Sequence, residues 1–197
     1  VGLGVEASGN QKLFTQGNLI QTDQRFDFAL EGDGFFQIMK PDGNIAYTRN
    51  GALKINDEGQ IVNSDGYALE PALILPEEGI VDSFTVDPDG KVFVQMYGEE
   101  ELTEIGQVEI ARFINPAGLS SIGSNLFLQT GASGSPIVSP PGEDGNGQIA
   151  QGKLETSNVM IVEEMVNMIM AQRAYEVSSK AVSTSDEMLQ LANQLKR

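Results

Sequence analysis

The sequence predicts an α+β protein in which a mainly β domain of hairpins and short strands is followed by one long C-terminal α-helix. Two observations lead to this fold class. From Phe26 onward, short apolar segments alternate with turn-forming Asp-Gly and Asn-Gly sequences, which is typical of antiparallel hairpins. After Gly152 the chain contains neither Gly nor Pro, and its apolar residues recur with the period of an α-helix.

The first 21 residues are assigned to a linker and a first strand. They begin with several glycines and continue with a weak alternation of apolar and polar residues. We expect an extended linker that enters a first strand near Lys12–Phe14. Because Val1 is an unusual natural start, we also expect that N-terminal sequence is missing from the chain.

Residues 22–150 are predicted to form an all-β outer domain. Phe26, Phe28 and Leu30 alternate with less apolar residues, as in a strand with one buried face. Turns such as Pro41-Asp42-Gly43-Asn44 separate the segments that follow. The expected strands are Phe35–Met39, Ile45–Thr48, Ala52–Ile55, Ile61–Asn63, Tyr67–Leu69, Ser83–Val86, Lys91–Met96, Gly106–Ile114 and Asn125–Gln129. The segment rich in Gly and Pro at 131–148 predicts an irregular loop, and residues 149–155 predict a last strand that leads into the helix.

Residues 151–197 are predicted to form a helical assembly segment. Apolar or small residues recur from Val159 to Leu195 at ten intervals covering 36 residues, a mean of 3.6 residues, which is the helical period. Thr156, Ser157 and Asn158 are possible N-cap residues before the helix. The acidic residues Glu163 and Glu164 follow in its first turn, and the basic residues Lys196 and Arg197 end it.

The predicted helix needs a partner that the rest of the chain does not offer. At about 1.5 Å per residue it would be about 55 Å long. Its first half is apolar on more than one side, and no second helix is predicted that could cover it. We therefore expect the partner to be another chain, or a part of this protein that is missing from the sequence.

The composition excludes several classes of function. The chain contains no His and no Cys, which excludes His or Cys metal sites, disulfides, and Ser-His-Asp and Cys-His catalysis. Its formal net charge is −16, and residues 1–150 hold 22 acidic and 7 basic residues, so binding to nucleic acid is not expected. No apolar segment is long enough to span a membrane, and no cleavable signal peptide is visible.

The acidic turns do not predict a metal site. Asp87-Pro88-Asp89-Gly90 lacks the third ligand of a calcium loop and has Met96 where that loop requires Glu. These turns are instead interpreted as hairpin turns, in which Gly provides the positive φ. Acidic pairs such as Glu77-Glu78 leave a carboxylate-based enzyme as an alternative. No catalytic residue, metal or cofactor is predicted.

Four stretches of the sequence carry a family resemblance. The C-terminal stretch Glu155–Gln190 (ETSNVMIVEEMVNMIMAQRAYEVSSKAVSTSDEMLQ) closely resembles the C-terminal signature of bacterial flagellar rod and hook proteins. Phe14–Ile38, Ala46–Leu69 and Gly118–Gly134 match the same family in the same order. The VGLGV segment at residues 1–5 favours the distal-rod branch of this family.

The resemblance implies a structural axial protein of the flagellar basal body and not an enzyme. It implies export through the flagellar channel without a cleavable signal peptide, and helical self-assembly into a rod that crosses the periplasm and transmits torque to the hook. The implied partners are copies of the chain itself, the proximal rod proteins, the hook protein and the surrounding P- and L-ring proteins, without nucleic acid or membrane insertion. In this family an N-terminal helix packs with the C-terminal one.

We expect ten residues of the helix to make the contacts between subunits. Eight are apolar or small, and two could add polar or cation–π contacts. They are Val162, Met165, Val166, Ile169, Arg173, Tyr175, Val177, Ala181, Met188 and Leu191. Two alternatives remain, namely another member of the family (a proximal rod, hook or hook-junction protein) and the carboxylate-based enzyme.

Overall fold

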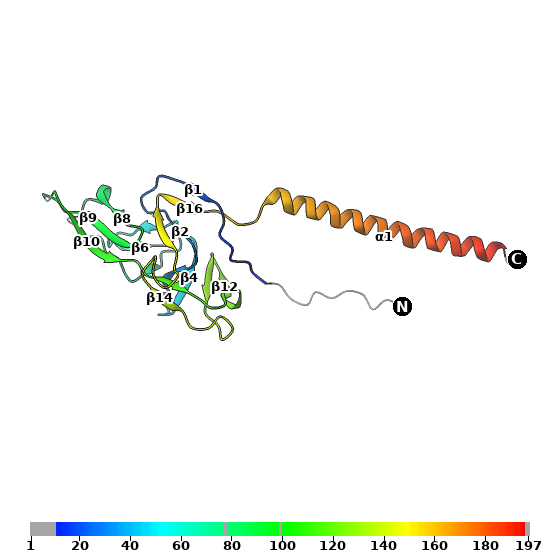
Figure 1. The fold of residues 1–197 in the computed structure, drawn as a ribbon, viewed down its shortest axis with the longest axis horizontal. Coiled ribbons are helices and arrows are strands. Elements are labelled where there is room, and N and C mark those ends of the chain that lie inside the picture. The colour runs from blue at the N-terminus through cyan, green and yellow to red at the C-terminus, as the bar shows by residue number, and fades with distance from the viewer. Residues whose placement is uncertain (1–10, 77–78, 99, 196–197) are drawn as a thin grey trace. The chain divides into compact units, whose positions relative to one another are not determined.

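The computed structural model describes residues 11–76, 79–98 and 100–195, and it divides into two units after Thr156. The first unit consists of short strands, and the second is a single long helix (Figure 1). The expected fold class is therefore confirmed. The predictions for residues 1–5, Glu77-Glu78, Lys196 and Arg197 lie outside the described residues.

The first unit contains sixteen strands and two short 3-10 helices. In chain order they are β1 (Leu19–Gln21), β2 (Phe28–Glu31), β3 (Phe35–Met39), β4 (Ile45–Thr48), β5 (Lys54–Ile55), β6 (Ile61–Val62), β7 (Ala68–Glu70), η1 (Val81–Ser83), β8 (Thr85–Val86), β9 (Lys91–Gln95), β10 (Leu102–Gln107), β11 (Ile110–Arg112), η2 (Pro116–Gly118), β12 (Ser120–Gly123), β13 (Leu126–Leu128), β14 (Ile137–Ser139), β15 (Gln148–Gln151) and β16 (Lys153–Glu155).

Strand β3 is the centre of the largest sheet. It pairs antiparallel with β4, β7 and β11, and the sheet continues through β13 to β12 on one side and through β6 to β5 on the other. Both faces of β3 are buried. Phe36 and Ile38 belong to the main hydrophobic core, whereas Phe35 packs on the other side with Tyr47 and Phe113. The large sheet therefore separates two apolar clusters.

Three smaller sheets complete the unit. Strands β8, β9 and β10 form a three-stranded sheet whose Val92 and Val94 are fully buried in the main core. Strand β15 pairs with β2, and β16 pairs with β1. These two pairs bring the segment that enters the unit alongside the segment that leaves it.

Several predicted strands are placed differently in the structure. Residues 11–18 form no strand, and the first strand is β1 rather than Lys12–Phe14. The predicted strand Gly106–Ile114 is divided between β10, which pairs with β9, and β11, which pairs with β3 and β14. The chain crosses from one sheet to the other at Val108, whose N–H donates to the Gly90 carbonyl at 2.8 Å. A segment predicted as one strand therefore contributes to two sheets.

The Gly-rich region also departs from the prediction. The expected loop at 131–148 contains strand β14, and strand β12 was not predicted. The expected last strand at 149–155 is divided into β15 and β16, because Gly152 adopts a φ of 73° and its carbonyl accepts from the Thr22 N–H at 2.8 Å. In β2, Ala29 is buried as well as Phe28 and Leu30, so this strand does not have one solvated face.

The second unit contains α1 (Ile161–Leu195), a helix of 35 residues. Glu163 and Glu164 lie in its first turn, as predicted. There the negative charges of the two carboxylates interact favourably with the positive end of the helix dipole. The helix begins later than the three expected cap residues. Instead, the Ser157 hydroxyl accepts a hydrogen bond from the Val159 N–H at 3.2 Å, before the first helical turn.

Candidate assembly interface

The apolar side chains of α1 are exposed along its length. Ile169 is 55% exposed and Val162 is 73% exposed, and the described residues of the second unit form no other element that could cover them. All ten side chains expected to make subunit contacts lie on this helix and are exposed. Exposure of this many large apolar groups is typical of a surface that binds another protein.

The helical period distributes these ten residues unequally around the axis. At 3.6 residues per turn, nine of them fall within a sector of about 160°, whereas Tyr175 lies on the opposite side, about 200° from Arg173. Arg173 pairs with Glu176 at 3.5 Å in an exposed contact. The structure therefore groups the apolar residues of the prediction and separates Tyr175 from them.

The apolar surface of α1 is wider than the predicted set. Ile161, Met168 and Leu189 lie outside the 160° sector and are 74%, 61% and 64% exposed. The sequence contained a signal for this, since apolar residues in the first half of the helix leave few polar positions. A helix with apolar residues on more than one side is suited to burial among several neighbours rather than on one surface.

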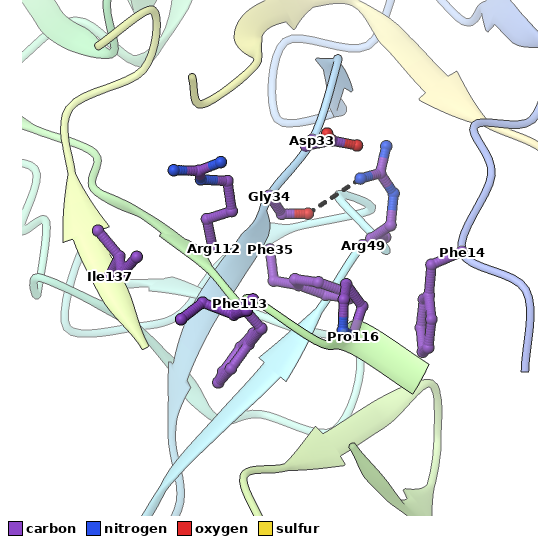
Figure 2. A pocket seen from close by; sticks show the side chains of 10 residues that line it. Phe14, Asp33, Gly34, Phe35, Arg49, Arg112, Phe113, Pro116 and Ile137 are labelled. Carbon is purple, nitrogen blue, oxygen red and sulfur yellow. Dashed lines mark hydrogen bonds between the residues drawn. The ribbon is translucent and has the colours of Figure 1, made fainter. Parts of the chain in front are cut away.

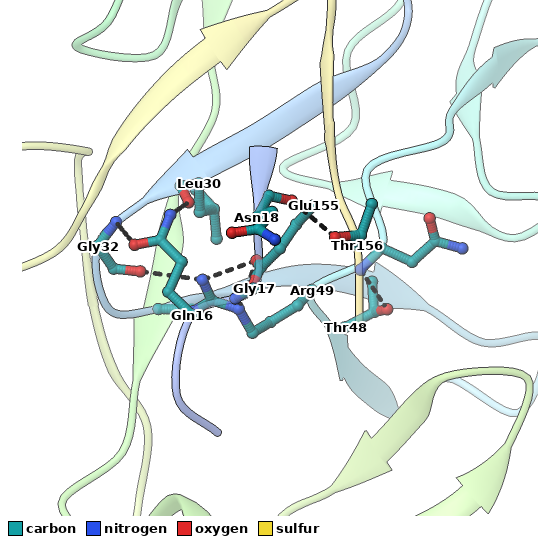
Figure 3. Close-up of polar contacts among 11 residues, drawn as sticks. Gln16, Gly17, Asn18, Leu30, Gly32, Thr48, Arg49, Glu155 and Thr156 are labelled. Atoms are coloured by element: carbon teal, nitrogen blue, oxygen red, sulfur yellow. Dashed lines mark hydrogen bonds and ion pairs between the residues drawn. The ribbon is translucent and has the colours of Figure 1, made fainter. Parts of the chain in front are cut away.

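The segment just before α1 is held in the first unit by an ion pair that the sequence did not indicate. Arg49, which follows β4, pairs with Glu155 at the end of β16, with the Arg49 Nη2 and Glu155 Oε2 atoms 2.8 Å apart (Figure 3). Both side chains are largely buried, at 15% and 9% exposed. Arg49 also donates to the carbonyls of Gly34 and Gly32, each at 3.0 Å.

The same ion pair holds the incoming chain. Glu155 Oε1 accepts from the Gly17 N–H at 2.9 Å, and the Gln16 side chain bonds both Gly32 and Leu30 (Figure 3). The Thr156 N–H donates to the Asn18 carbonyl at 2.8 Å. Incoming and outgoing segments are thus tied to each other and to the core directly before the helix.

A pocket of about 360 Å³ lies beside this network in the first unit. Figure 2 shows Arg49 and Arg112 on two sides of Gly34, above the rings of Phe35 and Phe113. Ten residues line it: Phe14, Asp33, Gly34, Phe35, Arg49, Arg112, Phe113, Ile114, Pro116 and Ile137. Asp33 is the single carboxylate among them, so this pocket does not provide the two facing acids that carboxylate-pair catalysis requires.

The rings of the pocket are part of a rigid aromatic cluster. The centroids of Phe14 and Phe35 are 5.4 Å apart, and Tyr47 and Phe113 lie 4.8 Å apart in an edge-to-face arrangement. Burial raises the pKa of Tyr47 above its ordinary value of 10.0. Within the described residues, no group of three or more acidic side chains is placed to hold a metal ion.

Two family models match the chain. Residues 29–94 match the flagellar hook protein FlgE/F/G D1 domain, and residues 150–195 match the C-terminal region of the flagellar basal body rod FlgEFG proteins. The flagellar basal-body rod protein FlgG of Borreliella burgdorferi strain B31 is 52% identical over 197 residues, which is the whole of this chain and 74% of that protein. The chain belongs to the FlgG family of flagellar basal-body rod proteins.

More distant relatives agree with membership of the FlgG family. FlgG of Bacillus subtilis strain 168 is 36% identical over the whole chain and 75% of its own length. The flagellar hook protein FlgE of Treponema pallidum is 31% identical, but the match covers 79% of this chain and only 32% of the hook protein. The recognised resemblance to the distal-rod branch is therefore confirmed over the alternative of a hook protein.

Membership of the FlgG family settles the class of function. The chain is a structural component of the distal rod in the flagellar basal body and not an enzyme. In the described part of the chain, no helix is both long enough and apolar enough to cross a membrane. The C-terminal family match at residues 150–195 covers the whole described length of α1.

Proposed function

We propose that copies of the chain polymerise helically through α1 to form the distal rod. The observation that carries this proposal is the exposure of large apolar side chains on more than one side of the helix, including Val162, Ile169 and Met168. Burying such side chains is the main favourable term in most protein association. Contacts on several sides join each helix to more than one neighbour, as a tube of packed helices requires.

In the proposed rod the helix forms the inner part and the strand-rich unit forms the outer part. The expected division is an outer domain at residues 22–150 and an assembly segment at 151–197. Head-to-tail contacts between identical subunits that do not close on themselves generate a helical filament. The ten expected contact residues are proposed to lie in these helix–helix interfaces, with the 160° apolar sector containing most of the buried area.

The ion pair between Arg49 and Glu155 anchors the segment that precedes the helix to the strand-rich unit. Torque applied to the helices passes to the strand-rich unit through the segment around Thr156. The incoming strand β1, the outgoing strand β16 and the Arg49 side chain hold this segment together.

The remaining partners follow from the position of a distal rod. We propose contacts with the proximal rod proteins at one end, the hook protein at the other, and the P- and L-ring proteins around the outside. We also propose export through the flagellar channel without a cleavable signal peptide. A helix that becomes fully ordered only on assembly would be compatible with passage through a narrow channel.

Substitution of Ile169 by Asp tests the proposed role of the helix. A carboxylate at this position would be desolvated in the helix interface, so rod assembly and swimming should be lost while the strand-rich unit remains folded. Asn167→Asp is the matched control, because it adds the same charge two residues away at a polar position. Rods would be isolated and counted by electron microscopy, and folding followed by circular dichroism. Normal swimming of the Ile169→Asp strain would refute the proposal.

A further inference from the structure

The pocket beside Phe35 contains a positive charge without a partner. Arg112 comes from β11, and its Nε atom is buried with no hydrogen-bond partner. Among the described residues the rest of its guanidinium also makes no hydrogen bond and no ion pair, whereas Arg49 across the pocket is fully paired. Asp33 lines the pocket too, but it forms no ion pair with either arginine in the described structure.

A guanidinium with a buried, unpaired Nε and no counter-charge favours an incoming acid. Leaving a buried donor unsatisfied is costly, and a carboxylate matches the planar fork of a guanidinium. The floor of the pocket consists of the aromatic rings of Phe14, Phe35 and Phe113, which suit an apolar or aromatic group. The occupant should therefore carry an acidic side chain next to a large ring or aliphatic group.

The turn between β9 and β10 of the same protein carries both kinds of group. Tyr97 is 76% exposed and Leu102 is 55% exposed, and Glu100 and Glu101 between them are also exposed. The turn therefore offers an acid for a free guanidinium and a ring for an aromatic floor within one short segment. In Figure 1, β9 and β10 lie at the end of the first unit that is away from β12.

We propose that the β9–β10 turn of one copy docks into the Phe35–Arg112 pocket of a second copy. Glu100 or Glu101 then pairs with Arg112, and Tyr97 packs on the aromatic floor. Because the turn and the pocket are different patches of one unit, the contact is heterologous, and it repeats from copy to copy along the proposed helical rod. This inference deepens the proposed function, since it adds a contact between outer units to the contact between helices.

Introduced cysteine pairs test the contact in assembled rods. The 197 residues contain no native Cys, so Tyr97→Cys combined with Ile114→Cys introduces two thiols at chosen positions of this sequence. Ile114 is 84% exposed and lines the pocket, so its replacement removes no buried contact. Mild oxidation of purified rods should yield a ladder of disulfide-linked multimers on a non-reducing gel.

The control combines Tyr97→Cys with Ile74→Cys in place of Ile114→Cys, because Ile74 is also exposed (53%) but does not line the pocket. Its multimer yield should be at least tenfold lower. Rods that assemble normally but give no ladder would overturn the inference and leave assembly through the helix intact. A cross-link to a different protein would overturn it as well.

A charge exchange gives a second, independent measurement. Arg112→Glu and the pair Glu100→Arg, Glu101→Arg should each reduce the number of rods per cell several-fold, and combining the three changes should restore it. Circular dichroism of each variant checks that the strand-rich unit is folded, and Arg112→Gln serves where Arg112→Glu does not fold. If the combined variant assembles no better than the single changes, the proposed pairing is wrong.

Discussion

Arg49 shows how one side chain can join distant parts of this protein. Its guanidinium contacts Glu155, which is 106 residues away in the sequence, and two carbonyls next to β3. Because the pair is largely buried, removing one partner leaves a charge that water cannot fully solvate. Lys153 in β16 and Glu31 in β2 also form an ion pair, but both of these side chains are exposed to water.

Glu155→Gln should lower the free energy of unfolding of the first unit by about 3 kcal/mol, because Arg49 loses its counter-charge in a buried site. Urea unfolding followed by circular dichroism measures this. Glu31→Gln is the matched control, since it breaks the exposed pair with Lys153, and it should cost about 1 kcal/mol or less. Equal losses in the two variants would show that burial of the Arg49–Glu155 pair is unimportant.

Tyr47 makes the stability of the first unit sensitive to alkaline pH. Burial raises its pKa in the folded state, so above pH 10.0 the unfolded chain releases the phenol proton while the folded chain retains it. The stability that the neutral, buried phenol of Tyr47 contributes is fully present below pH 10.0 and is lost as the pH rises through the pKa of Tyr47 in the folded state.

The Tyr47→Phe variant should therefore lose less stability between pH 9 and pH 11 than the parent chain. Urea unfolding at a series of pH values measures the difference. Tyr97→Phe, at a tyrosine that is 76% exposed, is the control and should follow the parent. If the stability of Tyr47→Phe changes with pH in the same way as that of the parent chain, the raised pKa of Tyr47 does not control the alkaline loss of stability.

At the scale of elements, several strands are placed by close approach of the backbone. The Phe28 N–H at the start of β2 donates to the Gly51 carbonyl at 2.9 Å, and a Cβ added at Gly51 would lie 1.8 Å from the Phe28 carbonyl oxygen. Only a residue without a side chain allows the loop after β4 to lie this close to β2. Strand β2 carries Phe28 and Leu30 into the main core, so the contact positions a large part of that core.

Gly51→Ala should destabilise the first unit by at least about 2 kcal/mol, because the added methyl group forces β2 and the loop apart. Gly131→Ala is the matched control, since no atom lies within 4 Å of a Cβ added there. Thermal unfolding of the two variants compares them directly. The prediction fails if both proteins melt at the same temperature.

The other dominant element is α1, whose apolar residues have no partner within their own unit. Helices in proteins gain most of their stability from packing of an apolar face and not from intrinsic propensity. A long helix with exposed Val, Ile and Met on several sides should therefore become more stable when copies meet. The fraction of α1 that is helical should therefore increase with the concentration of the protein.

At the scale of the whole molecule, the helical circular dichroism signal should rise as the protein concentration increases from micromolar to millimolar. Association buries the apolar surface of α1 and so favours its folded state by mass action. The Ile169→Asp variant is the control and should show a smaller rise at the same concentrations. A full helical signal that is constant at all concentrations in a monomer would mean that α1 is stable alone, and the proposed coupling of folding to assembly would be wrong.

The sequence by itself determined the features that depend on neighbouring residues. The helix, its acidic first turn and most hairpins were predictable because a helical period and a Gly-containing turn act over a few residues. Strands Phe35–Met39 and Ile45–Thr48 were predicted with the bounds that the structure has. The ten proposed contact residues could be named for the same reason, since they follow from the period of one helix.

Only the tertiary structure decided which distant segments meet. The pairing of β1 with β16, the Arg49–Glu155 ion pair and the pocket around Arg112 join residues that are far apart along the chain. The division of residues 106–114 between two sheets has the same origin. An apolar run signals burial but does not state against which strand, because strand pairing depends on the path of the whole chain and not on local preference.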